Sequence, residues 1–142
     1  MPRFSRSAAA VMVIVGLLSA CGSSPPEGKG PDPATVKASG PGPARVTLSK
    51  EGAERIGVQT APVRRAGGGR LEIPYAAILY APDGKAYAFT EPERLTFDRR
   101  PITVASIHGR AAILSDGPPA GTKVVRVGAS ELYGAETGVA GE

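Results

Sequence analysis

The chain has almost none of the residue types that build disulfides and most metal sites. Its 142 residues contain no Trp, a single Cys and a single His. With Cys21 and His108 as the lone members of their types, no internal disulfide, thiolate cluster or ordinary His-based metal site can be assembled. We therefore predict neither a bound metal nor a cofactor.

Long helices and the common catalytic motifs are also missing. The 19 glycines and 14 prolines interrupt regular structure throughout the chain, and the length allows one domain at most. The glycine run at residues 67–69 is not followed by Lys and Ser or Thr, so it is no phosphate-binding loop, and no nucleophile elbow occurs. A hydrolytic enzyme is the poorest interpretation, and we predict that the protein is not an enzyme.

The first 20 residues are typical of an export signal. Arg3 and Arg6 precede an apolar run from Ala8 to Leu18, which is too short to span a bilayer. This segment, residues 1–20, is predicted to be a lipoprotein signal peptide.

The end of this signal indicates lipidation. Leu18, Ser19 and Ala20 precede Cys21 and resemble a bacterial lipobox, in which the cysteine becomes the first mature residue and carries the lipid. We predict Cys21 as the lipid attachment site, which anchors the protein to the extracytoplasmic face of the cell membrane without a transmembrane helix. The alternative is a chance cysteine after an ordinary signal peptide.

The charge balance argues against nucleic acid as a partner. The formal net charge is +4, and removal of Arg3 and Arg6 with the signal takes away two of these positive charges. The remainder is too small for a nucleic-acid reader, and export argues in the same direction.

Residues 21–44 read as a lipidated Cys followed by a disordered tether. Six prolines and five glycines occur after Cys21, and Val36 is the one large apolar side chain of the segment. Such a sequence buries too little apolar surface to offset its ordering entropy. As a coil it would reach roughly 25–30 Å and hold a folded domain clear of the lipid headgroups.

The folded domain is predicted at residues 45–134, with a flexible tail at 135–142. A short helix is expected near Lys50–Ile56, because Ser49 can cap its start and Gly57 can end it. The rest alternates as short strands separated by turns, which predicts a mainly β fold, a small antiparallel β-barrel-like domain with one or two short helices. Strands are predicted at Val58–Val63, Leu71–Tyr80, Lys85–Thr90, Leu95–Ile107, Arg110–Leu114 and Thr122–Val127, with a short turn or helix at Ser130–Tyr133.

Two local features of these strands carry further predictions. A Pro-Asp-Gly turn at residues 82–84 is expected to close a hairpin between the second and third strands. In the fourth strand the apolar positions change parity between Phe97 and Ile102, so one additional residue must be absorbed between them. A β-bulge is therefore predicted at residues 99–101, where Pro101 is also tolerated.

The order of these elements carries a family resemblance. The motifs are Ile73-Pro74-x-x-Ala77-Ile78, the Pro-Asp-Gly turn, Ala88-Phe89, Phe97-x-x-Arg100-x-Ile102-x-Val104 and Gly117-x-x-x-Gly121-x-x-Val124-Val125-x-x-Gly128. They resemble the C-terminal membrane-proximal domain of periplasmic adaptor (membrane fusion) proteins, which link inner-membrane efflux pumps of the resistance-nodulation-division class to an outer channel. Upstream, Val46-Thr47-Leu48-Ser49 and Ile56-Gly57-Val58-x-Thr60-x-x-Val63 resemble the opening segment of the cation-efflux branch.

The resemblance implies a reduced adaptor. In the family, the opening strand and the C-terminal strands are separated by a lipoyl-like domain, a helical hairpin and a β-barrel domain, whereas only Arg64–Arg70 separates them here. The closing motif departs from the family, with Pro118 where Leu is usual and Thr122 where Asp is usual. The implied function is an accessory module that binds an efflux transporter or another envelope protein.

Two pairs of arginines are candidate contact residues. Arg64-Arg65 and Arg99-Arg100 would suit anionic lipid headgroups or an acidic patch on a partner protein. The alternative is that they are solvated charges that guard strand edges against aggregation.

The remaining polar candidates read as turn residues. His108 precedes Gly109 in an expected hairpin turn, and Asp83 and Asp116 each precede a glycine, which is ordinary turn chemistry. No catalytic residue is predicted. A small-ligand or metal-binding lipoprotein, acting as a carrier or sensor, stays open as an alternative function, and a pocket lined by Tyr75, Tyr80 and Tyr87 would support it.

Overall fold

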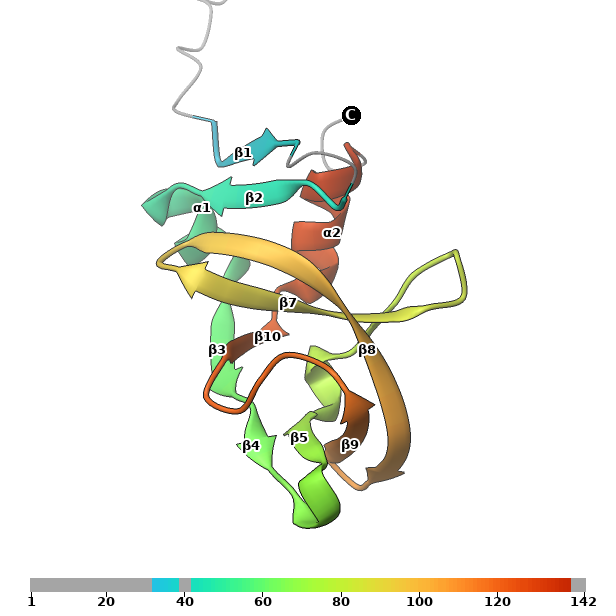
Figure 1. Cartoon of the computed structure of the whole chain (residues 1–142). Helices are drawn as coiled ribbons and strands as arrows, with labels where there is room; N and C mark the ends of the chain where they lie inside the picture. The colour runs from blue at the N-terminus through green and yellow to red at the C-terminus, as the bar shows by residue number, and fades with distance from the viewer. Residues whose placement is uncertain (1–31, 39–41, 139–142) are drawn as a thin grey trace, which may run out of the picture.

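The computed structural model describes residues 32–38 and 42–138 (Figure 1). The predicted signal peptide, the predicted lipobox at Leu18, Ser19 and Ala20, and the predicted lipid attachment site Cys21 lie outside the described residues. The elements are β1 (Ala34–Lys37), β2 (Arg45–Leu48), α1 (Lys50–Ile56), β3 (Gln59–Pro62), β4 (Arg64–Arg65), η1 (Gly67–Gly69), β5 (Leu71–Pro74), η2 (Tyr75–Ala77), β6 (Leu79–Tyr80), β7 (Ala86–Glu93), β8 (Thr96–His108), β9 (Ala111–Asp116), β10 (Lys123–Val127) and α2 (Ala129–Thr137).

The predicted mainly β fold and its barrel-like closure are confirmed. The strands pair in the order β3-β10-β7-β8-β9-β5-β4, every pair antiparallel. The two ends of this path, β3 and β4, are separated along the chain by Val63 alone, so the sheet nearly closes on itself. Val63 is buried, its N–H donates to the Thr122 carbonyl at 2.8 Å, and its carbonyl accepts from Gly121 N–H at 2.8 Å.

The first helix forms where the capping residues predict it. The Ser49 side chain accepts a hydrogen bond from the Gly52 amide at 3.0 Å, and Gly57 ends the helix in the left-handed region with φ 69°. Ser49 satisfies one of the orphan amides of the first turn, and glycine takes the positive φ without a Cβ penalty. Local chemistry therefore sets both ends of α1.

The interior consists of two hydrophobic clusters on opposite faces of β7, β8 and β10. Adjacent residues of one strand point into different clusters, as side chains of a strand must. The first cluster contains Ala88, Ile102 and Val124, and the second contains Phe89, Phe97 and Val125. Each of these three strands thus contributes buried side chains to both clusters. The second cluster is completed by β2 and α2 through Val46, Leu48 and Leu132.

The predicted bulge at residues 99–101 is wrong. The β7–β8 register runs without a break from Asp98 to Ile102, and β8 instead shifts register against β9 between Thr103 and Ser106. The parity change that led to the prediction has another cause: Phe97 and Ile102 pack on opposite faces of the sheet, in different clusters. A strand that serves two cores needs no additional residue between them.

The predicted strand over residues 71–80 is interrupted. The 3-10 turn η2 follows Pro74 and divides it into β5, which pairs with β4 and β9, and β6, which pairs with β7. The hairpin with the Pro-Asp-Gly turn therefore involves β6 alone. Because the N–H of Ile78 donates to the Tyr75 carbonyl at 3.0 Å, the turn has its own hydrogen bond and redirects the chain.

Both boundaries of the predicted domain also move. Residues 34–37, placed in the disordered tether, form β1, because Val36 and Thr35 find antiparallel partners in Val46 and Thr47 of β2. Helix α2 continues to Thr137, so a flexible tail from residue 135 is wrong for residues 135–137. The Glu136 side chain, which is 4% exposed, holds that last turn against the sheet. Residues 139–142 lie outside the described residues.

Candidate functional site

The structure divides the four candidate arginines between two places. Arg99 and Arg100 lie in the middle of β8, whereas Arg64 and Arg65 form β4 at the end of the barrel (Figure 1). The two pairs therefore do not make one surface.

Arg99 is largely buried between two aromatic rings. Its guanidinium carbon lies 4.4 Å from the ring centre of Tyr87 and 5.2 Å from that of Tyr133, and its side chain is 15% exposed. Its Nε lies 2.8 Å from Oε2 of Glu136. The two atoms are at ion-pair distance but not aligned as a hydrogen bond, and neither has a hydrogen-bond partner. This cluster joins α2 to β7 and β8 through cation–π and charge attraction.

Tyr87 is fixed at its other end by Asp83. The phenol donates to Oδ2 of Asp83 at 2.6 Å, while Oδ1 accepts from the Lys85 amide at 3.0 Å. These hydrogen bonds to the charged form lower the pKa of Asp83, and the phenol–carboxylate bond raises the pKa of Tyr87. Asp83 therefore has the turn role that the sequence predicts for it.

Arg100 is exposed, and its neighbour Asp98 is paired with Arg45. Arg45 donates from Nε and a terminal nitrogen to the two carboxylate oxygens of Asp98, at 2.7 and 2.8 Å. This bidentate contact lowers the pKa of Asp98. Arg100 lies 3.9 Å from the same carboxylate, and its side chain is 61% exposed.

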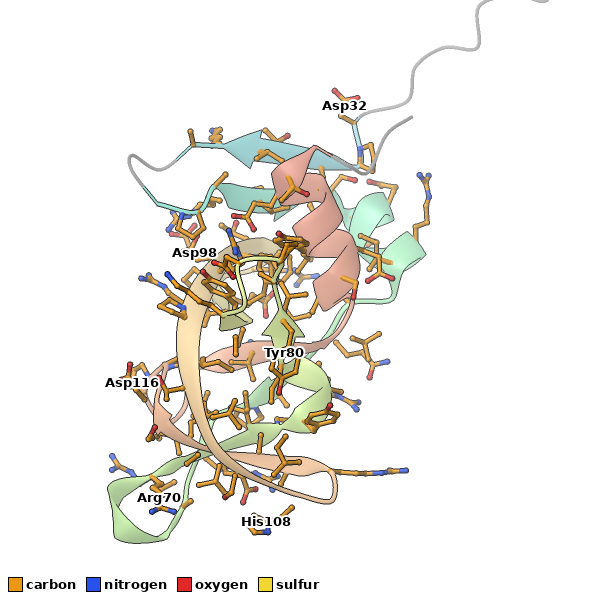
Figure 2. The ribbon with its side chains drawn as sticks, turned by 90° about the vertical axis from the view of Figure 1, so that its right-hand side faces the viewer. Asp32, Arg70, Tyr80, Asp98, His108 and Asp116 are labelled. Atoms are coloured by element: carbon orange, nitrogen blue, oxygen red, sulfur yellow. The ribbon has the colours of Figure 1, made fainter. Side chains whose placement is uncertain are left out.

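The end of the barrel farthest from Asp32 carries arginines of a different kind. Figure 2 shows Asp32 at one end of the molecule and Arg70 and His108 at the other. Among residues 42–138, Arg64, Arg65, Arg70 and Arg110 take part in no ion pair. His108 is exposed, and its Nε2 lies 3.0 Å from the Ser106 hydroxyl.

Two adjoining recesses open at this end, and we call them together the seam cleft. The first, of about 310 Å³, lies where β3 and β5 diverge. The second, of about 300 Å³, shares Pro74 and Arg110 with the first. The lining residues are Ala61, Pro62, Arg64, Glu72, Ile73, Pro74, His108, Arg110 and Ala111 in the first recess, and Pro74, Tyr75, Ala76, Gly109, Arg110 and Arg126 in the second.

The three tyrosines of the alternative prediction do not share an environment. Tyr87 is 9% exposed beside Arg99, whereas Tyr75 and Tyr80 are 45% and 59% exposed. Within the described residues, no three His, Cys, Asp or Glu side chains are grouped so that they could hold a metal ion. Asp116 is exposed at the end of β9. The single-ligand pocket that would favour a carrier is therefore not assembled from these tyrosines.

Sequence reasoning missed Arg70, Arg110 and Arg126 as members of this end of the barrel. Arg70 follows Arg64 closely and joins it through the β4–β5 hairpin. Arg110 and Arg126 stand singly and far from Arg64 in the sequence, and only the β5–β9 and β3–β10 pairings bring their strands to this site. The one sequence signal for this position was Gly109, which marks a turn that carries Arg110.

Comparison with known proteins identifies no relative. No protein-family model, no curated protein and no solved structure matches this chain. In the part of the chain that the structure describes, neither helix has the length and apolar character needed to cross a membrane.

Proposed function

We propose that this chain is a lipid-anchored extracytoplasmic interaction module, an accessory to a membrane transport or envelope complex. The proposal combines the lipobox ending at Cys21 with the resemblance of residues 46–134 to the membrane-proximal domain of efflux adaptors. A small β-domain with a nearly closed sheet is the fold that this resemblance implies.

One observation carries the proposal: four arginines that take part in no ion pair within the described residues, Arg64, Arg65, Arg70 and Arg110, lie toward the end of the barrel opposite the N-terminal entry. The chain enters at Asp32 beside β1, and Arg70 lies at the far end (Figures 1 and 2). In the proposed module, Arg64, Arg65 and Arg110 are presented toward a partner, because they lie at the end of the domain opposite the described start of the chain.

The test is a partner search with the lipidated chain in its native host. Mass spectrometry of the mature protein first establishes whether Cys21 is the N-terminal residue and carries the lipid. Crosslinking in cells, mild solubilisation and purification should then recover a stoichiometric transporter or envelope protein.

The control is Cys21→Ala, which removes the anchor. We expect this variant to lose the partner while its circular dichroism spectrum stays mainly β. An unlipidated wild-type chain, or a lipidated chain that recovers no stoichiometric partner, would overturn the proposal.

A further inference from the structure

The seam cleft exists because β3 and β5 diverge on one side of Val63. β4 pairs with β5 at Arg64 and Arg65, but β3 pairs with β10, so Ala61 and Pro62 are left across the cleft from Ile73 and Pro74. Each border of the cleft thus carries a proline, which has no N–H to donate. Addition of a partner strand along these edges is therefore disfavoured, and recognition must come from side chains.

The side chains around the cleft are predominantly cationic. Arg64, Arg110 and Arg126 line it from three strand ends, and Glu72 is the one carboxylate among its lining residues. Glu72 faces Arg64 in the β4–β5 register without forming an ion pair. The guanidinium groups of Arg64 and Arg110 are consequently left to bind an anion from outside.

Two of these residues are held in place by hydrogen bonds. The Arg110 carbonyl accepts from the Tyr75 amide at 2.8 Å, which fixes the backbone between the two recesses. Arg126 donates to the side-chain oxygen of Gln59 on β3. Between the arginines the cleft is apolar, through Ile73, Pro74 and Ala111. A planar guanidinium beside an apolar wall suits a carboxylate on an aliphatic stem.

We propose that the seam cleft binds an acidic segment of a partner protein, with Arg64 and Arg110 each receiving a carboxylate. This inference rests on the proposed function and names the chemistry of the partner. A protein segment fits better than a lipid surface for two reasons. The arginines line recesses, which a flat layer of headgroups does not fill. They share the first recess with His108, which Figure 2 shows at the end opposite the entry of the chain at Asp32.

The test uses the lipidated full mature chain in nanodiscs and a fluorescent hexaglutamate peptide as the probe. In zwitterionic phosphatidylcholine nanodiscs we expect saturable binding that weakens with salt. Arg64→Glu/Arg110→Glu should weaken hexaglutamate binding at least about tenfold, because the hydrogen bonds between the guanidinium groups and the peptide carboxylates are lost. Arg64→Lys/Arg110→Lys keeps the charge but removes the planar forks and should weaken binding by a smaller factor.

The matched control carries the same charge change at the other end of the molecule. Lys37→Glu/Lys50→Glu alters exposed residues of β1 and α1, where the Lys50 side chain is 72% exposed. We expect the affinity of this variant for hexaglutamate to stay within about twofold of the wild-type affinity, because only the net charge of the molecule has changed. Equal losses in the two variants would show a diffuse charge effect and overturn the proposed site.

A second arm distinguishes a protein segment from lipid. The same titration is repeated in nanodiscs that contain anionic phosphatidylglycerol. Undiminished hexaglutamate binding at matched salt supports the proposal. Binding that is lost in the anionic nanodiscs but retained in the phosphatidylcholine nanodiscs would assign the arginines to headgroups and overturn the proposal. Absence of saturable binding in both nanodiscs would also overturn it.

Failure of this inference and failure of the proposed function give different results. A partner recovered from cells with Arg64→Glu/Arg110→Glu as readily as with wild type would leave the interaction module standing and reject the cleft as its site. Hexaglutamate binding by a chain that recovers no partner from cells would leave the cleft standing as an anion site and reject the interaction module.

Discussion

The arginines of the sheet and those of the barrel end have opposite surroundings. Arg45 and Arg99 each face a carboxylate that is mostly withdrawn from solvent, on Asp98 and Glu136, whose side chains are 14% and 4% exposed. Arg64 and Arg110 face solvent and the seam cleft without a paired carboxylate in the described structure. Arginine thus has two roles in this molecule. In the sheet it holds elements together, and at the barrel end it is available to a partner.

Arginines that are adjacent in the sequence can have different surroundings in the fold. Arg99 and Arg100 are adjacent, yet their alternation across the sheet sends one side chain under α2 and the other to solvent. Substitutions in the two regions should therefore separate stability from binding.

The largest effect is expected from Arg99→Ala. The change leaves the Glu136 carboxylate buried without its counter-charge and removes contacts with Tyr87 and Tyr133, so we expect a loss of about 3–5 kcal/mol in the free energy of unfolding. Urea denaturation followed by circular dichroism measures it. Arg99→Met/Glu136→Leu, which removes both charges, should lose much less. A single substitution as mild as the double one would show that the pair is not coupled.

The next effect concerns the end at which the chain enters. A Cβ at Gly52 would overlap the carbonyl oxygen of Pro33, a backbone atom that cannot rotate away. Gly52→Ala should therefore cost about 1–3 kcal/mol and raise the hydrogen-exchange rate of β1. Gly67→Ala is the control, because nothing lies within 4 Å of its Cβ position. Equal exchange rates of β1 in the two variants would contradict the prediction.

A smaller effect should appear as a dependence of stability on pH. The pKa of Asp98 is lowered by its hydrogen bond with Arg45, and that of Asp83 by its hydrogen bond with Tyr87. Their stabilisation is complete above the ordinary aspartate pKa of about 4 and is lost as the pH falls through the lowered values.

Thermal unfolding from pH 6 down to about pH 2 checks this dependence. We expect the melting temperature to fall most steeply below about pH 4, and Asp98→Asn to lower it by a few degrees at neutral pH while flattening the acid decline. An Asp98→Asn variant that retains the full acid decline would assign it to other carboxylates.

The smallest effect on stability is expected at the barrel end. Arg64→Glu/Arg110→Glu alters exposed arginines without ion pairs in the described structure, so the free energy of unfolding should change by no more than about 0.5 kcal/mol. Urea denaturation on the preparation used for peptide binding gives this value. A loss as large as that from Arg99→Ala would erase the distinction between the two kinds of arginine.

Local signals in the sequence predicted the elements well where the chemistry is local. Ser49 and Gly57 set the ends of α1, and the Pro-Asp-Gly turn sits between β6 and β7, with Gly84 at φ 76°. The change of direction at His108-Gly109 was also predicted, and Gly109 has φ 58°. Such turns depend on the conformations open to one or two residues, so no distant partner is needed to specify them.

Predictions that depended on distant partners fared worse. The parity change between Phe97 and Ile102 predicts a bulge only if a strand contributes to one core, whereas β8 contributes to two. The candidate site was found only in part: Arg64 was named from its position, but Arg110 and Arg126 join it through strand pairings that the sequence does not display.

The mainly β class, the first helix and the turns can be read from the residues alone, because glycine, proline and capping side chains restrict the backbone within a few residues. The enclosure of Arg99 by Tyr87 and Tyr133, and the position of Arg64 and Arg110 along an open cleft, follow from the fold and not from any local pattern. The burial and pairing of a charge depend on side chains brought together by folding.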